Sequence, residues 1–141
     1  MKTYKGQITK VEANQIFVFG SNTQGRHGKG AALFALKHCG AIYGQAKYLQ
    51  GQSWAIITKD ISVRPHKGYF IDEIILQIKD LYGFARRMPH LEFLIPYQAE
   101  SVNLNGYSPQ QMAQMFFEAG VIPDNIVFEE GFSKLISYVD N

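Results

Sequence analysis

The sequence is poor in the features that mark secreted, membrane-bound or metal-binding proteins. It has a single cysteine, Cys39, so no disulfide can form within the chain. No apolar run approaches the roughly 20 residues that a membrane-spanning helix needs, and the first ten residues, MKTYKGQITK, lack the apolar core of a signal peptide. The histidines and the cysteine do not have the spacing of metal ligands. We therefore expect a cytoplasmic protein with no membrane partner, no metal site and no cofactor.

An excess of charge of either sign is also lacking. The 14 Lys and Arg residues nearly balance the 12 Asp and Glu residues, which leaves a formal net charge of +2. A basic field this small argues against a nucleic-acid partner. Hydrophobic residues make up 46% and charged residues 18% of the chain, as in ordinary folded proteins. A length of 141 residues suits one core, so we expect a single domain over residues 1–141.

The sequence has no long apolar run, but it has several short ones. Four of them are continuous rather than alternating, which is typical of strands covered on both faces, and they lie at residues 16–19, 55–58, 93–96 and 126–128. Two further segments are ambiguous. Residues 7–11 are expected to add an edge strand, and residues 132–139 a terminal helix or strand.

Helical patterns separate these runs. Residues 71–82 carry an apolar stripe at helical spacing, opposite a polar face formed by Asp72, Glu73, Gln77 and Asp80. The Ser-Pro-Gln-Gln segment at 108–111 predicts a capped helix start, and the Ala-rich residues 30–39 predict a helix that ends at Gly40. Because strands and helices alternate, the sequence predicts an α/β fold with a mainly parallel sheet. Ligands bind such sheets at the carboxyl ends of the strands.

One such end carries a glycine-rich loop, GSNTQGRHGKGAA, at residues 20–32. Glycines let backbone N–H groups approach an anion, the following helix adds its positive end, and Arg26, His27 and Lys29 add donors. We therefore predict a phosphate-binding loop, the alternative being a flexible turn with solvated charges. No Ser or Thr follows the lysine as in a P-loop, and Leu33 stands where a Rossmann loop has its third glycine. Residues 58–60 end another strand and either border the pocket or form a local turn.

Several of these segments resemble the macro domain family, in its divergent phage and bacterial branch. The chain has Gly6-Gln7-Ile8-Thr9, then the apolar run, the turn Gly20-Ser21-Asn22 and the glycine-rich loop, in the family's order. A second family loop, of Gly-x-Gly-Leu-Ala-Gly type, corresponds to residues 101–107. Gln7 replaces the family's acidic residue and Phe19 the first Asn of its turn, while Ser101 and Asn103 replace glycines. The resemblance implies a three-layer α/β/α macro-like domain with a mostly parallel mixed central sheet.

The resemblance also implies a small-molecule nucleotide partner, ADP-ribose or a related ADP-ribosyl nucleotide, held by two phosphate-cradling loops. The residues expected to bind it are Gln7, Ile8, Gly20, Ser21, Asn22, Gly25, Arg26, His27, Gly28, Lys29, Gly30, Ser101, Val102, Asn103, Leu104, Asn105, Gly106 and Tyr107. If the protein is a hydrolase of an ADP-ribosyl bond or a terminal phosphate, Asn22 and His27 are the candidate catalytic residues. His27 is alternatively only a donor to phosphate, and the protein a non-catalytic sensor or sponge for a nucleotide signal.

Overall fold

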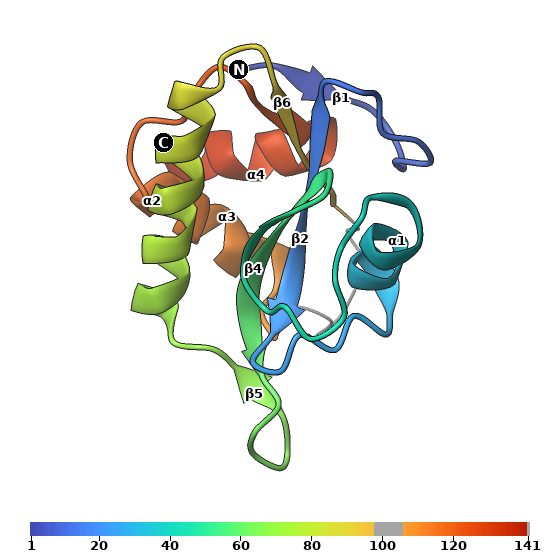
Figure 1. Ribbon diagram of the computed structural model, residues 1–141. Helices are drawn as coiled ribbons and strands as arrows, with labels where there is room; N and C mark the ends of the chain where they lie inside the picture. Colours follow the sequence, from blue (N-terminus) through green and yellow to red (C-terminus); the bar gives the residue numbers. More distant parts are fainter. Residues whose placement is uncertain (98–105, 141) are drawn as a thin grey trace.

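The computed structural model of the protein describes residues 1–97 and 106–140. Its strands are β1 (Thr3–Tyr4), β2 (Gln15–Asn22), β3 (Tyr48–Gln50), β4 (Ser53–Asp60), β5 (Lys67–Gly68), β6 (Glu92–Ile95) and β7 (Ile126–Glu129). Its helices are α1 (Gly30–His38), α2 (Ile71–Arg87), α3 (Pro109–Glu118) and α4 (Glu130–Asp140). Figure 1 shows their arrangement. The four apolar runs lie in β2, β4, β6 and β7, as predicted.

One mixed sheet joins all seven strands, in the order β1-β7-β6-β2-β4-β3, with β5 also paired to β4. Neighbours from β1 to β4 run parallel, whereas β3 and β5 are antiparallel to β4. The predicted α/β fold with a mostly parallel mixed sheet is therefore confirmed. The carboxyl ends of β2, β4, β6 and β7 meet at one edge of the sheet, at the bottom of the view in Figure 1 for β2 and β4.

Helices cover both faces of the sheet. Helix α1 lies on one side of β2, and α2, α3 and α4 lie on the other (Figure 1). Alternate residues of β2 divide between two cores, since Phe17 and Phe19 pack with α1 whereas Ile16 and Val18 pack with the other three helices. Truncating a fully buried residue such as Ile78 to alanine costs about 2–5 kcal/mol in cores of this kind. The result is three layers, α/β/α.

The helix boundaries follow local signals in the sequence. Helix α3 starts with a capping box between Ser108 and Gln111, and Pro109 occupies its first position. Helix α1 ends at its C-cap Cys39, and Gly40 follows with a φ of +75°, a value that favours glycine. The terminal segment forms a helix, α4, while residues 7–11 form no strand. The edge position expected for them is taken by β1, which pairs with β7.

The position of Gln77 corrects the sequence-based assignment of a polar face on α2. Its side chain is buried, with 2% exposed. Its Oε1 accepts a hydrogen bond from the Ile57 N–H (2.7 Å), and its Nε2 donates to the Ile57 carbonyl (2.9 Å). Ile57 pairs with β2 on one side, and on the other edge of β4 it lies between the segments paired with β3 and β5, where no described strand supplies partners. The side chain of Gln77 therefore replaces one residue of a neighbouring strand.

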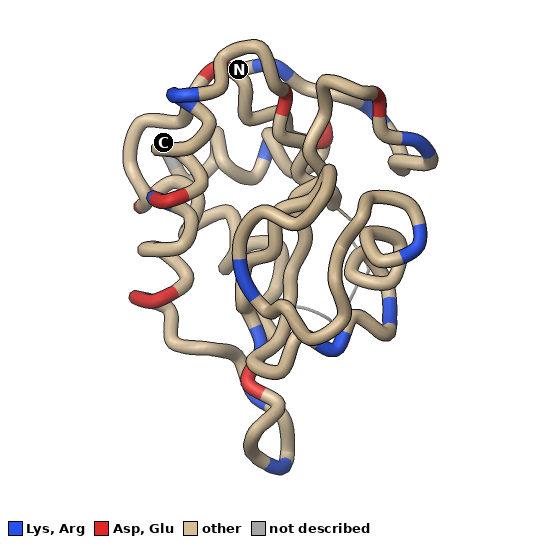
Figure 2. Tube along the Cα trace, in the orientation of Figure 1, with Lys and Arg blue, Asp and Glu red and all other residues tan. Residues whose placement is uncertain are grey.

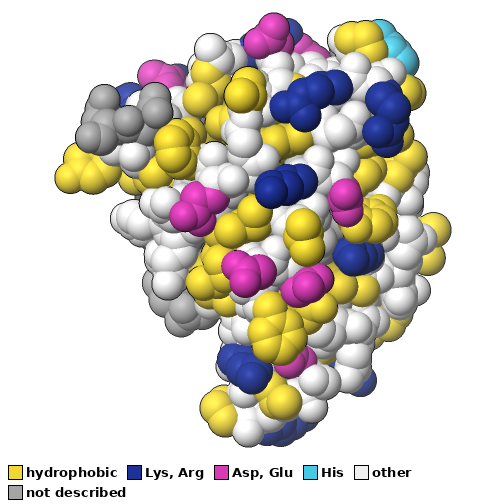
Figure 3. Space-filling view, turned by 90° about the vertical axis from the view of Figure 1, so that its left-hand side faces the viewer, with side chains coloured by type: hydrophobic (Ala, Val, Ile, Leu, Met, Phe, Trp, Pro, Cys, Tyr) yellow, Lys and Arg dark blue, Asp and Glu magenta, His cyan; other side chains and the backbone are white. Residues whose placement is uncertain are grey.

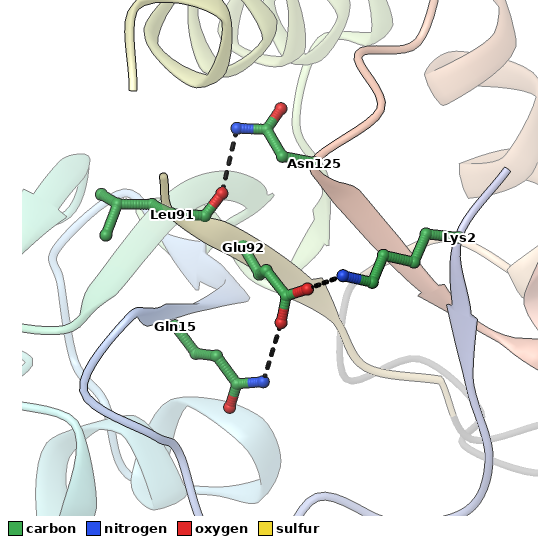
Figure 4. A network of polar contacts seen from close by, with 5 residues as sticks. All are labelled: Lys2, Gln15, Leu91, Glu92 and Asn125. Atoms are coloured by element: carbon green, nitrogen blue, oxygen red, sulfur yellow. Dashed lines mark hydrogen bonds and ion pairs between the residues drawn. The ribbon is translucent and has the colours of Figure 1, made fainter. Parts of the chain in front are cut away.

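The amino ends of the strands are joined by polar side chains far from the carboxyl edge (Figure 4). Glu92 of β6 accepts hydrogen bonds from Lys2 and from Gln15 Nε2 (3.1 Å). Asn125 Nδ2 donates to the carbonyl of Leu91 (3.0 Å), and also to those of Ala85 and Met88. These bonds connect the strand starts to the end of α2. Within residues 1–97 and 106–140, no helix combines the length and apolarity needed to cross a membrane.

Candidate functional site

A cleft of about 510 Å³ opens at the carboxyl edge of the sheet. It lies where β2 and β6 are neighbours, and the chain leaves these two strands toward opposite faces, into α1 and α3 respectively (Figure 1). A place where neighbouring strands lead to opposite faces is called a topological switch point. It leaves a crevice at the carboxyl ends of the strands, and in open α/β sheets this crevice is the usual place for a ligand. The volume lies within the range of small-molecule sites, about 300–1,000 Å³.

Many residues expected to bind ligand lie around this cleft. Those lining it are Gln7, Ile8, Gly20, Ser21, Asn22, Arg26, Gly28, Lys29, Gly30 and Tyr107. Gly25, His27 and Gly106 are not among the lining residues. Ser101, Val102, Asn103, Leu104 and Asn105 lie outside the described residues. The structure thus brings the first predicted loop, the amino-terminal segment and Tyr107 to one cavity.

The side chain of Asn22 shapes the loop that follows β2. Its Oδ1 accepts hydrogen bonds from the N–H groups of Gln24 (3.2 Å) and Arg26 (3.0 Å). Its Nδ2 donates to the Arg26 carbonyl (2.9 Å). An asparagine that bonds the backbone ahead of it in this way closes a turn. Asn22 therefore holds residues 22–26 in a tight curve, so that Arg26 and Gly28 line the cleft.

Gly25 is buried at the back of this curve. Its φ is +66°, and a Cβ at this position would come within 2.6 Å of the Gly44 carbonyl carbon. The Gly44 N–H donates to the Gly25 carbonyl at 2.9 Å. Only glycine fits both the backbone angle and the close approach. Gly25 thus attaches the loop to the segment after α1 and does not face the cleft.

His27 is placed in the core rather than in the cleft. Its ring is completely buried and meets the ring of Phe19 edge-on at 5.1 Å between centroids. Its Nε2 donates to the Gln45 carbonyl at 3.0 Å, while Nδ1 has no hydrogen-bond partner among the described residues. Aromatic packing and the bond to Gln45 together draw the side chain inward. The candidate acid or base of the loop therefore contacts protein on all sides.

The start of α1 forms the cationic wall of the cleft. Lys29 is the N-cap residue, no side chain caps the helix, and its first turn contains no acidic residue. The first N–H groups of a helix have no partner within it, and they carry partial positive charge. Gly28 has open space where a Cβ would be, and Arg26 and Lys29 are exposed. Several donors thus face the space where an anion would sit.

The opposite wall comes from the end of β4 and from the hairpin that leads to β5. Thr58, Lys59, Ile61 and His66 all line the cleft. The sequence interpretation placed residues 58–60 at the pocket as one of two options, but gave His66 no role. His66 could have been suspected only from the length of its loop, because its contribution depends on how the hairpin folds back beside β4.

The segment after the undescribed residues packs against the same hairpin. A Cβ at Gly106, whose φ is +77°, would lie 2.8 Å from the Gly68 Cα, so these two backbones touch. The Tyr107 ring lies directly over Gly68, and its hydroxyl donates to the Tyr69 carbonyl. Burial raises the pKa of the Tyr107 hydroxyl. Gly106 therefore has a packing role, and Tyr107 is a neutral, aromatic part of the cleft wall.

The part of the cleft that is lined by the amino-terminal segment is mainly apolar. Ile8 and Phe34 line it, and the Phe34 ring packs against Phe17 at 4.9 Å between centroids. Gln7 is exposed beside them and offers an amide that can donate and accept. An apolar surface with one amide at its rim suits a flat heterocycle, which needs contacts on its face and hydrogen bonds at its edge.

The charge around the cleft favours an anion. Arg26, Lys29 and Lys59 contribute to its lining, and none of the described lining residues is Asp or Glu. Figure 2 shows that Lys and Arg predominate at the lower end of the molecule, where this edge of the sheet lies. No three His, Cys, Asp or Glu side chains in the described part of the chain gather as a metal site would require. The cleft is therefore suited to phosphate groups bound by donors and cations.

Comparison with known proteins leaves the family unassigned. A scan against protein-family models and a search of curated protein sequences find no match to the chain. The case for any function consequently depends on the motifs and on the geometry of the cleft.

Proposed function

We propose that the cleft binds ADP-ribose or a related ADP-ribosyl nucleotide, and that the chain is a macro-like domain. One observation carries the proposal. The cationic glycine loop at the start of α1 and the apolar end formed by Ile8 and Phe34 belong to the same cavity of about 510 Å³. A ligand that fills both ends must combine an anionic part with a flat apolar part, and a nucleoside diphosphate has this composition.

The diphosphate is assigned to the start of α1. There the backbone N–H group of Gly30 and the side chains of Arg26 and Lys29 supply neutral and charged donors. The base is assigned to the apolar end, against Phe34, with its edge at the Gln7 amide. Because an amide carries no charge, this edge contact is weaker than one to a carboxylate.

Binding without cleavage is the form of the proposal that the side chains favour. The three hydrogen bonds of the Asn22 amide all go to the loop, and the His27 ring is buried. The His27 ring does not line the cleft, and the Asn22 oxygen already accepts two hydrogen bonds, so only the second N–H of the Asn22 amide is left to contact a ligand or water. Hydrolysis of an ADP-ribosyl bond or a terminal phosphate is the second candidate, favoured by one observation. His66 lines the cleft and is exposed, and a histidine can serve as general acid or base.

Isothermal titration calorimetry with ADP-ribose, ADP and AMP tests the proposal. We expect ADP-ribose to bind, and Lys29→Ala to weaken it by about tenfold or more, because a charge-assisted hydrogen bond is removed. Lys134→Ala, which removes an exposed lysine from α4, is the matched control and should leave the affinity unchanged. Absence of heat for all three ligands at millimolar concentration would contradict the proposal.

Long incubation with ADP-ribosyl substrates separates the two candidates. Ligand recovered unchanged, as seen by phosphorus NMR, supports a sensor or sponge. Turnover that is abolished in His66→Gln, with binding of ADP-ribose retained, supports the hydrolase instead.

A further inference from the structure

The Gln7 side chain is an unpaired polar group at the apolar end of the cleft. Gln7 lines the cleft and is exposed, and its amide has no hydrogen-bond partner within residues 1–97 and 106–140. The nearby Tyr4 hydroxyl also lines the cleft, but it donates to the Ile95 carbonyl (2.8 Å). A primary amide has an acceptor oxygen and two N–H donors. Gln7 therefore offers both kinds of hydrogen bond to a ligand.

The backbone just before Gln7 is fixed to the sheet. Tyr4 pairs with Glu129 of β7, and the Gly6 N–H donates to Glu129 Oε2 (3.3 Å). Gly6 has a φ of +87°, so a glycine suits the turn by which the chain leaves β1 and reaches the cleft. These contacts set the position of Gln7 at the rim of the cleft and leave its side chain free to turn.

The carboxylates close to this segment are engaged elsewhere. Glu129 Oε1 accepts a hydrogen bond from the Gly131 N–H, in addition to the bond that Oε2 accepts from Gly6. Glu12 forms an ion pair with Lys10 (3.8 Å). Neither carboxylate lines the cleft. The edge of a base bound at the apolar end therefore meets a neutral amide rather than a charged acceptor.

An apolar wall accompanies the amide. Ile8 and Phe34 line the cleft, and both pack half-buried against the core cluster around Phe17. The Phe34 ring also contacts the His38 ring, at 5.0 Å between centroids. The face over α2 is different, because hydrophobic side chains there are interspersed with charges of both signs (Figure 3). The cleft wall is thus the better surface for the face of a neutral heterocycle whose edge bonds to an amide.

We propose that Gln7 lets the cleft accept 6-oxopurine nucleotides, with hypoxanthine or guanine as the base, as well as adenine nucleotides. The inference rests on the function proposed above, which assigns the base to the apolar end. Adenine has a donor at position 6 and an acceptor at N1, whereas a 6-oxopurine has an acceptor at O6 and a donor at N1. Half a turn of the amide exchanges its oxygen and its N–H groups, so Gln7 can form two hydrogen bonds with either edge. A carboxylate has acceptors only and would favour adenine.

The test compares ADP-ribose with inosine diphosphate ribose, which differs from it only at position 6 and N1 of the base. Calorimetry on the unaltered protein should give dissociation constants within about threefold of each other, because the number of hydrogen bonds to the base edge is the same. A preference for ADP-ribose of about tenfold or more would overturn the proposal.

Substitutions at Gln7 show whether this residue reads the base edge. Gln7→Glu should weaken inosine diphosphate ribose relative to ADP-ribose by about tenfold or more, since O6 then faces a charged acceptor and no donor. Repulsion between the new carboxylate and the diphosphate affects both ligands alike and cancels in this ratio. Gln7→Leu should weaken both ligands and leave the ratio unaltered. Gln114→Glu, at an exposed glutamine of α3 that does not line the cleft, is the matched control and should change neither affinity.

The inference and the proposed function can fail separately. If ADP-ribose binds and inosine diphosphate ribose does not, the proposed function stands and the role given to Gln7 is wrong. If both ligands bind but Gln7→Glu leaves their ratio unaltered, the base is not read by Gln7, and the inference is again wrong. If neither ligand produces heat at millimolar concentration, the proposed function fails together with the inference.

Discussion

Replacing Asn22 with alanine tests whether this residue acts through the shape of the loop. The substitution removes three hydrogen bonds, two accepted by Oδ1 and one donated by Nδ2. Each such bond contributes about 0.5–1.5 kcal/mol. Because Asn22 is half-buried, the N–H groups of Gln24 and Arg26 can partly recover bonds to water. We expect the free energy of unfolding to fall by about 1–3 kcal/mol in total.

The same substitution should weaken ADP-ribose binding more than stability alone explains. A loosened loop must be ordered again when the phosphate binds, so the affinity should fall by about tenfold at a ligand concentration where the protein stays folded. Asn22→Asp is the informative partner, because it retains the oxygen acceptor and loses the donor to Arg26. It should retain part of the stability but bind anions less well, since it adds a negative charge. Urea unfolding and calorimetry on the same preparations measure both quantities. An alanine variant with unaltered stability and affinity would refute the reasoning.

Three further substitutions probe features that position the site. Gly25→Ala should destabilise the fold by about 2–4 kcal/mol in urea unfolding, because a Cβ at this positive φ meets the Gly44 backbone. Gly28→Ala is the control and should leave stability nearly unchanged. Equal stabilities of the two variants would contradict the packing argument. Gln77→Leu should cost about 2–4 kcal/mol, since it leaves the part-buried Ile57 N–H and carbonyl without their partners; a neutral effect would mean that water replaces them. Hydrogen bonds from Lys2 and Gln15 lower the pKa of the Glu92 carboxyl, so its stabilising contribution is present above the ordinary pKa of 4.5 and is lost as the pH falls through the lowered value. Unfolding curves between about pH 6 and pH 3 should therefore converge for the wild type and Glu92→Gln, and parallel pH profiles would exclude the effect.

The sheet could be predicted because its central strands are encoded locally. Residues 16–19, 55–58, 93–96 and 126–128 are continuous apolar runs, and burial on both faces requires just such a pattern. The helix start at Ser108 depends on a capping box of four residues, so it too is local. The strands β1, β3 and β5 have two or three residues each, and their pairing is decided by neighbours distant in the chain.

The candidate site was predictable only in part, for a similar reason. The loop after β2 has glycines and cations that indicate an anion site on their own. The burial of His27 depends on the Gln45 carbonyl and on the Phe19 ring, which the sequence does not place beside it. The cleft position of His66 depends on the path of the hairpin. Helical periodicity placed Gln77 on a polar face, but it carries no information on the unpaired backbone of β4 that Gln77 meets.

The amide of Gln77 has a consequence for how the protein behaves at high concentration. A strand of eight residues with an unpaired edge is a template to which strands of other molecules can add, the first step of edge-to-edge aggregation. The outer edge of β4 is closed in three pieces, by β3, by the Gln77 side chain and by β5. At the other end of the sheet the edge strand β1 has only two residues, too few to recruit a partner. The same side chain that completes the hydrogen bonding of β4 therefore also closes an edge to which a strand of another molecule could add.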